Sequence, residues 1–154
     1  MKRHPSLHPL SQHHHFALIQ ALEMRRAAEV EHQVEKFVRF WHKSGPVHFR
    51  EEEEVLPPAY ARHTRRDRDA EVMRILADHA EIRAAALDFE RRLAAKTPIE
   101  AEEIARLGKL LHDHVRPEEN EVFPRIEKTP GEEQLNAMGR GLTRLHSRND
   151  VYEI

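Results

Sequence analysis

The sequence predicts an all-α protein: one antiparallel four-helix bundle followed by a short C-terminal helical extension. Charged residues make up 34% of the 154 residues and only five are glycine, which suits amphipathic helices better than strands joined by tight turns. Apolar residues recur at three- and four-residue spacing in four segments. A chain of this length can bury one substantial core without a disulfide.

The first two helices are marked by a cap and by apolar spacing. Ser11 can cap a helix that carries Leu18 on its apolar face. A second periodic segment covers residues 30–41 and then meets Gly45–Pro46. We expect a turn at residues 27–32, where neither glycine nor proline occurs, and a kink in the second helix at Gly45–Pro46.

The third and fourth helices are separated by a start signal. The third is expected to begin after Asp67 or Asp69 and to end at about Lys96. Residues 97–100, Thr-Pro-Ile-Glu, then combine a capping box with a proline in the first turn of the fourth helix. Pro117 lies further along this helix, and its missing N–H predicts a local bend there.

A shorter apolar segment follows the bundle. Its apolar residues are Leu135, Met138, Leu142 and Leu145. We expect residues 1–10 to form an N-terminal arm and residues 11–128 to form the bundle. Residues 129–154 would be an extension packed on the bundle or on a partner subunit, which leaves a homodimer open.

An internal repeat gathers histidines and glutamates. Aligning HFREEEEVLPPAY, from His48, with HVRPEENEVFPRI, from His114, also superimposes Glu52 on Glu118. A nearly equal shift aligns the earlier segments HHFAL and DHAEI. Each helical hairpin thus supplies one histidine from its first helix and a His-x-x-x-Glu pair from its second.

These residue types predict a metal centre. Residues four apart lie on one helix face, so each pair can present a nitrogen and a carboxylate oxygen to the same point. Imidazole binds iron, zinc, copper and manganese, and a carboxylate can bridge two ions ~3.5–4 Å apart. The alternative is a structural bundle with solvated acidic residues. It gives no reason to bury six such groups, because unpaired buried ions cost several kcal/mol each.

The position of the first turn follows from the histidines. If one helix ran unbroken from Ser11 to Lys43, His15 would lie roughly 40 Å from its far end, near which His48 follows, too far for the two to share a metal. Within the run of three histidines, we assign His15 as the ligand because it precedes Leu18 by three residues, as His79 precedes Ile82. His14 is the alternative.

Composition narrows the functional class. Without cysteine there are no disulfides and no thiolate metal sites, and a reducing cytoplasmic location is expected. The formal charge of -2 argues against nucleic-acid binding. No long apolar run indicates a membrane span or a secretion signal.

The segments LSQHHHFAL, HFREEEEVLPP, DHAEI and HVRPEENEVFP resemble the hemerythrin-like family, also called the HHE cation-binding domain, of the symmetric H-HxxxE-H-HxxxE type. The resemblance covers nearly the whole chain and implies a four-helix bundle around two iron ions in a non-haem di-iron centre. The ligands that it implies are His15, His48, Glu52, His79, His114 and Glu118. His15 and His48 would bind one iron, His79 and His114 the other, with both glutamates bridging. No catalytic residue is assigned.

The chain differs from the oxygen-carrying members of that family. Ile75 stands where they have an additional histidine, and Glu118 follows its histidine by four residues where they have an aspartate after five. More open coordination positions favour reaction over reversible oxygen carriage. We therefore expect dioxygen or hydrogen peroxide as the partner, with peroxide decomposition (catalase-like) or another redox activity. An iron or oxygen sensor without turnover is the alternative.

Neighbouring acidic residues are expected to face solvent or to pair with Arg50, Arg116 and their neighbours. They are Glu51, Glu53, Glu54, Glu119 and Glu121. Glu53 and Glu119 have a second role open to them, as hydrogen-bond acceptors for a ligand imidazole.

Overall fold

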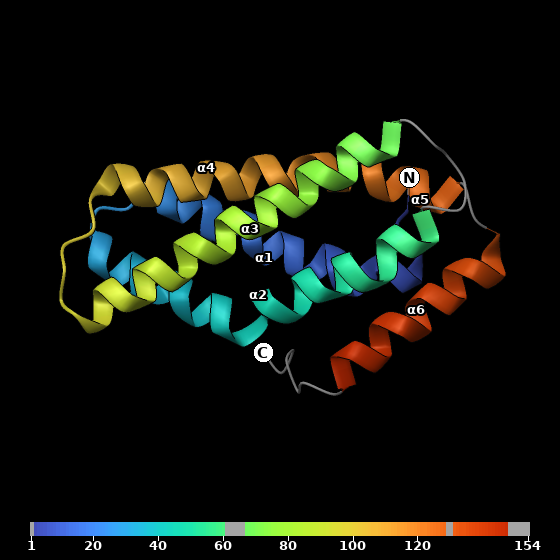
Figure 1. Cartoon of the computed structure of the whole chain (residues 1–154), viewed down its shortest axis with the longest axis horizontal. Helices are drawn as coiled ribbons and strands as arrows, with labels where there is room; N and C mark the ends of the chain where they lie inside the picture. The colour runs from blue at the N-terminus through green and yellow to red at the C-terminus, as the bar shows by residue number, and fades with distance from the viewer. Residues whose placement is uncertain (1, 61–66, 129–130, 148–154) are drawn as a thin grey trace.

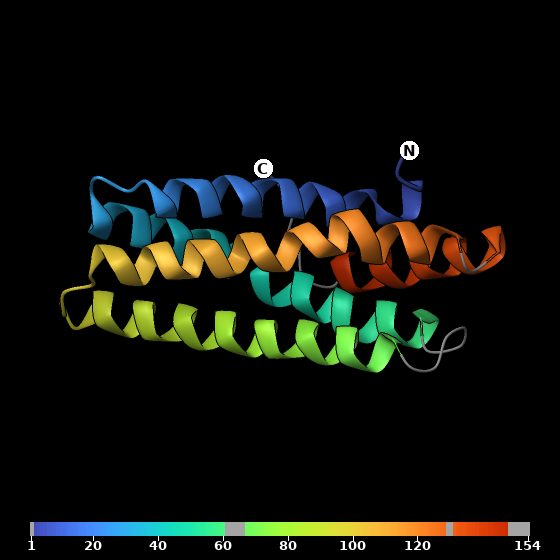
Figure 2. The ribbon, with the colours of Figure 1, turned by 90° about the horizontal axis from the view of Figure 1, so that it is seen from above.

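The computed structural model describes residues 2–60, 67–128 and 131–147, and the predicted all-α fold is confirmed. A 3₁₀ turn at Pro5–Leu7 leads into α1 (His8–Arg25), α2 (Val30–Tyr60), α3 (Asp67–Ala94) and α4 (Ala101–Pro117). A π-helical turn at Glu118–Val122, α5 (Phe123–Lys128) and α6 (Glu132–Ser147) follow. The four long helices run antiparallel along the long axis of the molecule (Figures 1 and 2).

The turn of the first hairpin lies where the spacing of the histidines predicts it. α1 ends at Arg25 and α2 begins at Val30, so the turn overlaps the expected residues 27–32. α2 continues through Gly45–Pro46 and bends near its middle (Figure 1). Pro46 lacks the N–H that an unbroken helix would use. A Cβ at Gly45 would collide with the Trp41 ring, so glycine is required at this close approach.

Two helix starts differ from the sequence expectation. α1 begins at His8, upstream of Ser11, and Ser11 instead accepts a hydrogen bond from Arg3. The capping box of α4 is formed by Glu100 and Glu103, three residues beyond the predicted position. Thr97 and Pro98 therefore belong to the connection that precedes the helix.

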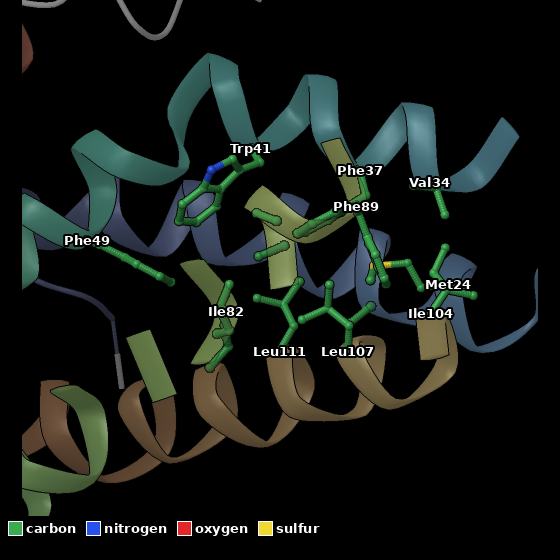
Figure 3. Close-up of a cluster of buried hydrophobic side chains, with 14 residues drawn as sticks. Met24, Val34, Phe37, Trp41, Phe49, Ile82, Phe89, Ile104, Leu107 and Leu111 are labelled. Carbon is green, nitrogen blue, oxygen red and sulfur yellow. The ribbon is translucent and has the colours of Figure 1, made fainter. Parts of the chain in front are cut away.

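The buried apolar side chains form two clusters. One fills the bundle near the two hairpin turns and includes Phe37, Ile82 and Leu107 (Figure 3). The other lies beyond the middle of the bundle and joins Leu10 and Phe123 to the apolar face of α6. Fully burying such side chains stabilises the fold by about 1.5–3 kcal/mol each. This burial offsets the cost of the polar residues enclosed between the clusters.

The C-terminal helix α6 packs against α2 and the Pro5–Leu7 turn (Figure 1). Its residues Leu135, Met138 and Leu142 are buried against Leu7 and neighbouring side chains. The division into an arm, a bundle and an extension stays a prediction, although residues of the arm and the extension share one core. Residues 148–154 of the extension lie outside the described residues.

None of the helices in the described ranges is long and apolar enough to cross a membrane.

Candidate metal centre

Six polar side chains meet in the middle of the bundle. Each of the four long helices contributes, and the π-helical turn supplies the sixth residue. All six are at most 2% exposed. They are His14 from α1, His48 and Glu52 from α2, His79 from α3, His114 from α4 and Glu118 from the π-helical turn.

Glu52 lies between two pairs of histidines. Its Oε1 atom is 2.9 Å from His14 Nε2 and 3.0 Å from His48 Nε2. Its Oε2 atom lies on the other side, 3.1 Å from His79 Nε2. Each oxygen of this carboxylate therefore faces a different histidine pair, which is the arrangement that a bridging carboxylate needs.

Glu118 also reaches both pairs. Its Oε2 atom is 3.3 Å from His14 Nε2 and 3.4 Å from His114 Nε2. The π-helical turn that begins at Glu118 follows directly after Pro117, where the sequence predicted a bend. Phe123 N–H bonds back to the Glu118 carbonyl, the wide hydrogen-bond spacing of a π turn. Such turns are frequent at functional sites.

The structure places His14 at the centre and His15 on the surface, so the choice of His15 is corrected. His14 is 1% exposed, whereas His15 faces outward. The interior face of α1 carries small residues, Ala17 and Ala21, because α1 packs closely on α4 at Gly108. A Cβ at Gly108 would lie 2.8 Å from the Ala21 carbonyl oxygen.

The choice of His15 depended on its three-residue spacing to Leu18, and this spacing was misleading. Apolar residues surround α1, and the outward face exposes Phe16, Ile19 and Leu22. The buried residues instead follow one spacing in both hairpins: His14, Ala17, Ala21 and Met24 in α1 match His79, Ile82, Ala86 and Phe89 in α3. Comparison of these interior positions would have identified His14.

The donor atoms fit a metal cation. Among the described residues, Nε2 of His79 and of His114 and Oε2 of Glu118 are buried without a hydrogen bond, although they lie beside one another. Two groups of ligand atoms lie within 4.8 Å of one another: His14, His48 and Glu52, and Glu52, His79, His114 and Glu118. A cation between the atoms of each group would satisfy donors that otherwise cost free energy.

The site stabilises positive charge around Glu52. Burial acts to raise the pKa of Glu52, but the charge of His48 and hydrogen bonds with His14 hold this pKa well below its usual range. Burial acts to lower the pKa of His14, but its contacts with the surrounding carboxylates raise it well above its usual range. For His48, burial prevails and lowers the pKa, which favours the neutral imidazole that binds metals.

Three of the histidines contact a further carboxylate through Nδ1, the ring nitrogen that does not face the centre. His14 Nδ1 donates to Glu119 at 2.7 Å, and His79 Nδ1 donates to Glu53 at 2.8 Å. These two glutamates therefore take the acceptor role that the sequence left open. Asp78, 3.3 Å from His114 Nδ1, was missed.

A sequence signal for these acceptors exists in retrospect. Glu53 follows Glu52, Glu119 follows Glu118, and Asp78 precedes His79. Each acceptor is therefore adjacent in sequence to one of the six central residues, and the histidine that donates to it lies in a different helix. Glu51, which we expected in solvent or paired with an arginine, is fully buried and accepts a 2.6 Å hydrogen bond from His146.

A cavity of about 30 Å³ adjoins Glu52 and Glu118. Its other walls are mainly apolar and include Leu56, Val72, Ile75, Leu76, Val122 and Ile126. This volume exceeds the about 10–15 Å³ that a cavity needs to hold one water molecule. The space next to both central carboxylates thus has room for a small ligand.

Comparison with known proteins agrees with this geometry. Residues 7–126 match the family described as the hemerythrin HHE cation binding domain. No curated protein and no solved structure is significantly similar to this chain. The match covers most of the sequence and all six central residues, whose side chains could hold a metal. The chain therefore belongs to the hemerythrin family of HHE cation-binding domains.

Proposed function

We propose that this protein binds two iron ions in a non-haem di-iron centre and that the centre binds dioxygen or hydrogen peroxide. The observation that carries the proposal is the position of Glu52, with one oxygen toward His14 and His48 and the other toward His79. A set of imidazoles and carboxylates suits iron, and bridging carboxylates suit paired ions.

Each ion would have two histidines of its own. His14 and His48 would bind one ion, His79 and His114 the other, and Glu52 and Glu118 would bridge them. When bound, iron supplies Lewis-acid and redox chemistry. The six side chains leave coordination positions to be filled by water or substrate, which favours reaction over simple storage of a cation.

The cavity supports a small substrate. It reaches Glu52 and Glu118, and its volume of about 30 Å³ has room for a molecule as small as dioxygen or hydrogen peroxide. Ile75, which stands where the oxygen-carrying members have a further histidine, lines this space. An apolar side chain there adds no further protein ligand beside the two carboxylates.

The proposed activity is peroxide decomposition in the cytoplasm. Anaerobic loading of the metal-free protein should give about two irons per chain and near-ultraviolet absorption that changes when peroxide is added. Hydrogen peroxide should then be consumed with release of dioxygen. His48→Ala and His114→Ala should each lose iron and this activity. Unchanged metal content in both variants would overturn the proposal.

An iron or oxygen sensor is the second candidate. It is favoured by the hydrogen bond of His146, at the end of α6, to Glu51, the residue before Glu52. A sensor would bind iron without consuming peroxide. Hydrogen exchange of α6 would change more than that of α3 and α4 on iron loading in a sensor, and no more than theirs if the centre acts only as a catalyst.

A further inference from the structure

For each proposed iron ion, one of its two histidines donates a hydrogen bond to a carboxylate that also accepts a hydrogen bond from an arginine. In the first case, His79 Nδ1 donates to Glu53 Oε1 at 2.8 Å, and Arg83 Nη1 donates to the same oxygen at 2.7 Å. The Phe49 ring stacks on His79 with centroids 3.7 Å apart, and Arg83 Cζ lies 5.2 Å from the centroid of that ring. We call Arg83, Glu53 and His79 the Arg83 relay.

The second case repeats this arrangement. His14 Nδ1 donates to Glu119 Oε1 at 2.7 Å, and Arg3 Nη2 donates to Glu119 Oε2 at 2.7 Å and to the Glu119 carbonyl at 2.9 Å. Phe123 stacks on His14 with centroids 5.3 Å apart, and Arg3 Cζ lies 5.2 Å from the Phe123 centroid. We call Arg3, Glu119 and His14 the Arg3 relay.

The internal repeat does not account for both arginines. Arg83 comes from α3, one turn after His79, whereas Arg3 precedes the first helical turn and lies outside the family match at residues 7–126. The two phenylalanines also come from different places, Phe49 from α2 and Phe123 from α5. In this twofold arrangement the histidines and glutamates thus occupy positions related by the repeat, whereas the arginines and phenylalanines come from unrelated positions.

The other two histidines are held less firmly. His114 Nδ1 meets Asp78 at 3.3 Å, and Arg74 reaches that carboxylate only at 3.5 Å. Within the described residues, His48 Nδ1 has no hydrogen-bond partner. Each proposed ion would therefore have one tightly held histidine and one that is freer to adjust.

We propose that Arg3 and Arg83 are positioning residues for the two ions: they fix Glu119 and Glu53, which orient His14 and His79 and set how strongly these imidazoles bind metal. The inference rests on the proposed metal centre. A carboxylate behind an imidazole increases its basicity and fixes its ring, and loss of such a partner typically weakens metal binding 10–100-fold. The arginine limits the motion of the carboxylate and adds a positive charge that opposes oxidation of the ion.

Removing an arginine has two effects on metal affinity, and these effects are opposite in sign. Loss of orientation weakens metal binding, whereas loss of a nearby positive charge strengthens it. Side-chain exposure is 35% for Arg83 and 19% for Arg3, so solvent screens their charges and the orientation effect should prevail. The charge effect should instead appear in the reduction potential, which should fall because the oxidised ions meet less repulsion.

The test compares Arg83→Gln and Arg3→Gln with the wild type as full-length, iron-loaded proteins. We expect iron affinity, measured by chelator competition, to fall about 10-fold in each variant, and the reduction potential to fall as well. Arg83→Lys keeps the charge but not the planar guanidinium. It should therefore keep the potential near the wild-type value and still bind iron more weakly.

Arg50→Gln is the matched control. Arg50 donates to Glu54 at 2.8 Å on α2, near the centre in sequence, but this pair is exposed and involves no histidine. Iron affinity and potential should be unchanged in this variant. If Arg83→Gln and Arg3→Gln behave like Arg50→Gln, or if they lower the melting temperature of the metal-free protein as much as that of the iron-loaded protein, the arginines have only a structural role.

Zinc binding separates failure of this inference from failure of the proposed function. Zinc accepts the same imidazole and carboxylate ligands. A wild type that binds zinc but no iron would overturn the di-iron function, and weaker zinc binding in Arg83→Gln and Arg3→Gln would still support the relays. Unchanged affinities for both metals in these variants would overturn the relays alone.

Discussion

His146 Nδ1 donates a 2.6 Å hydrogen bond to Glu51, a carboxylate that is fully buried beside Glu52. His146 lies in α6, beyond the residues that match the family, so the C-terminal helix reaches the shell around the centre. Together with the buried residues Leu135, Met138 and Leu142, this bond makes α6 part of the folded unit.

His146→Ala should lower the free energy of unfolding by about 1–3 kcal/mol, because it removes a hydrogen bond from a buried carboxylate. His112→Ala is the control, since His112 pairs with Asp113 at the surface. Urea unfolding of both metal-free variants measures the difference. Equal stability of the two would mean that solvent satisfies Glu51 when His146 is absent.

His14→Ala and His15→Ala should differ sharply although the residues are neighbours. His14 contacts Glu52, Glu118 and Glu119, whereas His15 is exposed. His14→Ala should lose at least one iron per chain, and His15→Ala should keep the wild-type content. Metal analysis after anaerobic loading decides between them, and loss of iron only in His15→Ala would restore the sequence-based choice.

The difference between these two histidines shows where sequence reasoning reached its limit. Spacing within a helix identified the His-x-x-x-Glu pairs, because a pair four residues apart must share a face. It could not choose among three successive histidines, because α1 carries apolar residues on its outward face as well. The close approach of α1 to α4 at Gly108, which selects small interior residues, depends on tertiary packing.

Other features depended on contacts distant in sequence. Arg3 and Glu119 are 116 residues apart, and no local pattern pairs them. Asp78 was missed for the same reason, since its partner His114 belongs to the next helix. By contrast, the first hairpin turn was predicted without glycine or proline, because the requirement that histidines meet constrains tertiary structure directly.

Removal of iron should lower the melting temperature. In the proposed centre, iron would bind ligands from four helices that come together only in the folded state. Binding would stabilise that state by mass action, by about 4 kcal/mol at a free concentration 1,000 times the dissociation constant. For a chain of this size, that corresponds to a shift of roughly 10 °C. Differential scanning calorimetry with and without a chelator measures it. His48→Ala should show little chelator effect, and identical melting of wild type under both conditions would contradict a metal that joins the hairpins.

The carboxylate of Glu103 should make the stability of the fold depend on pH, independently of the metal centre. This carboxylate accepts bonds from Arg92 at 2.7 and 2.9 Å and from Glu100 N–H at 2.9 Å at the start of α4. The Arg92 guanidinium, with the Glu100 N–H, lowers the pKa of Glu103 to about 2 from a usual value of 4.5. Because the folded-state pKa is the lower one, the stabilisation is present above pH 4.5 and is lost as the pH falls through about 2.

Glu103→Gln should therefore be less stable than the wild type at neutral pH, and the difference should shrink as the pH falls from 4.5 toward 2. Urea unfolding of the metal-free proteins across this range measures it, so that loss of iron in acid does not contribute. Glu102→Gln is the control, because Glu102 is an exposed carboxylate in the same first turn. A difference between Glu103→Gln and wild type that stays constant from pH 6 to pH 2 would show that the Arg92 pair does not hold the start of α4. Iron content at neutral pH should be the same in all three proteins, since this end of α4 lies three turns from His114.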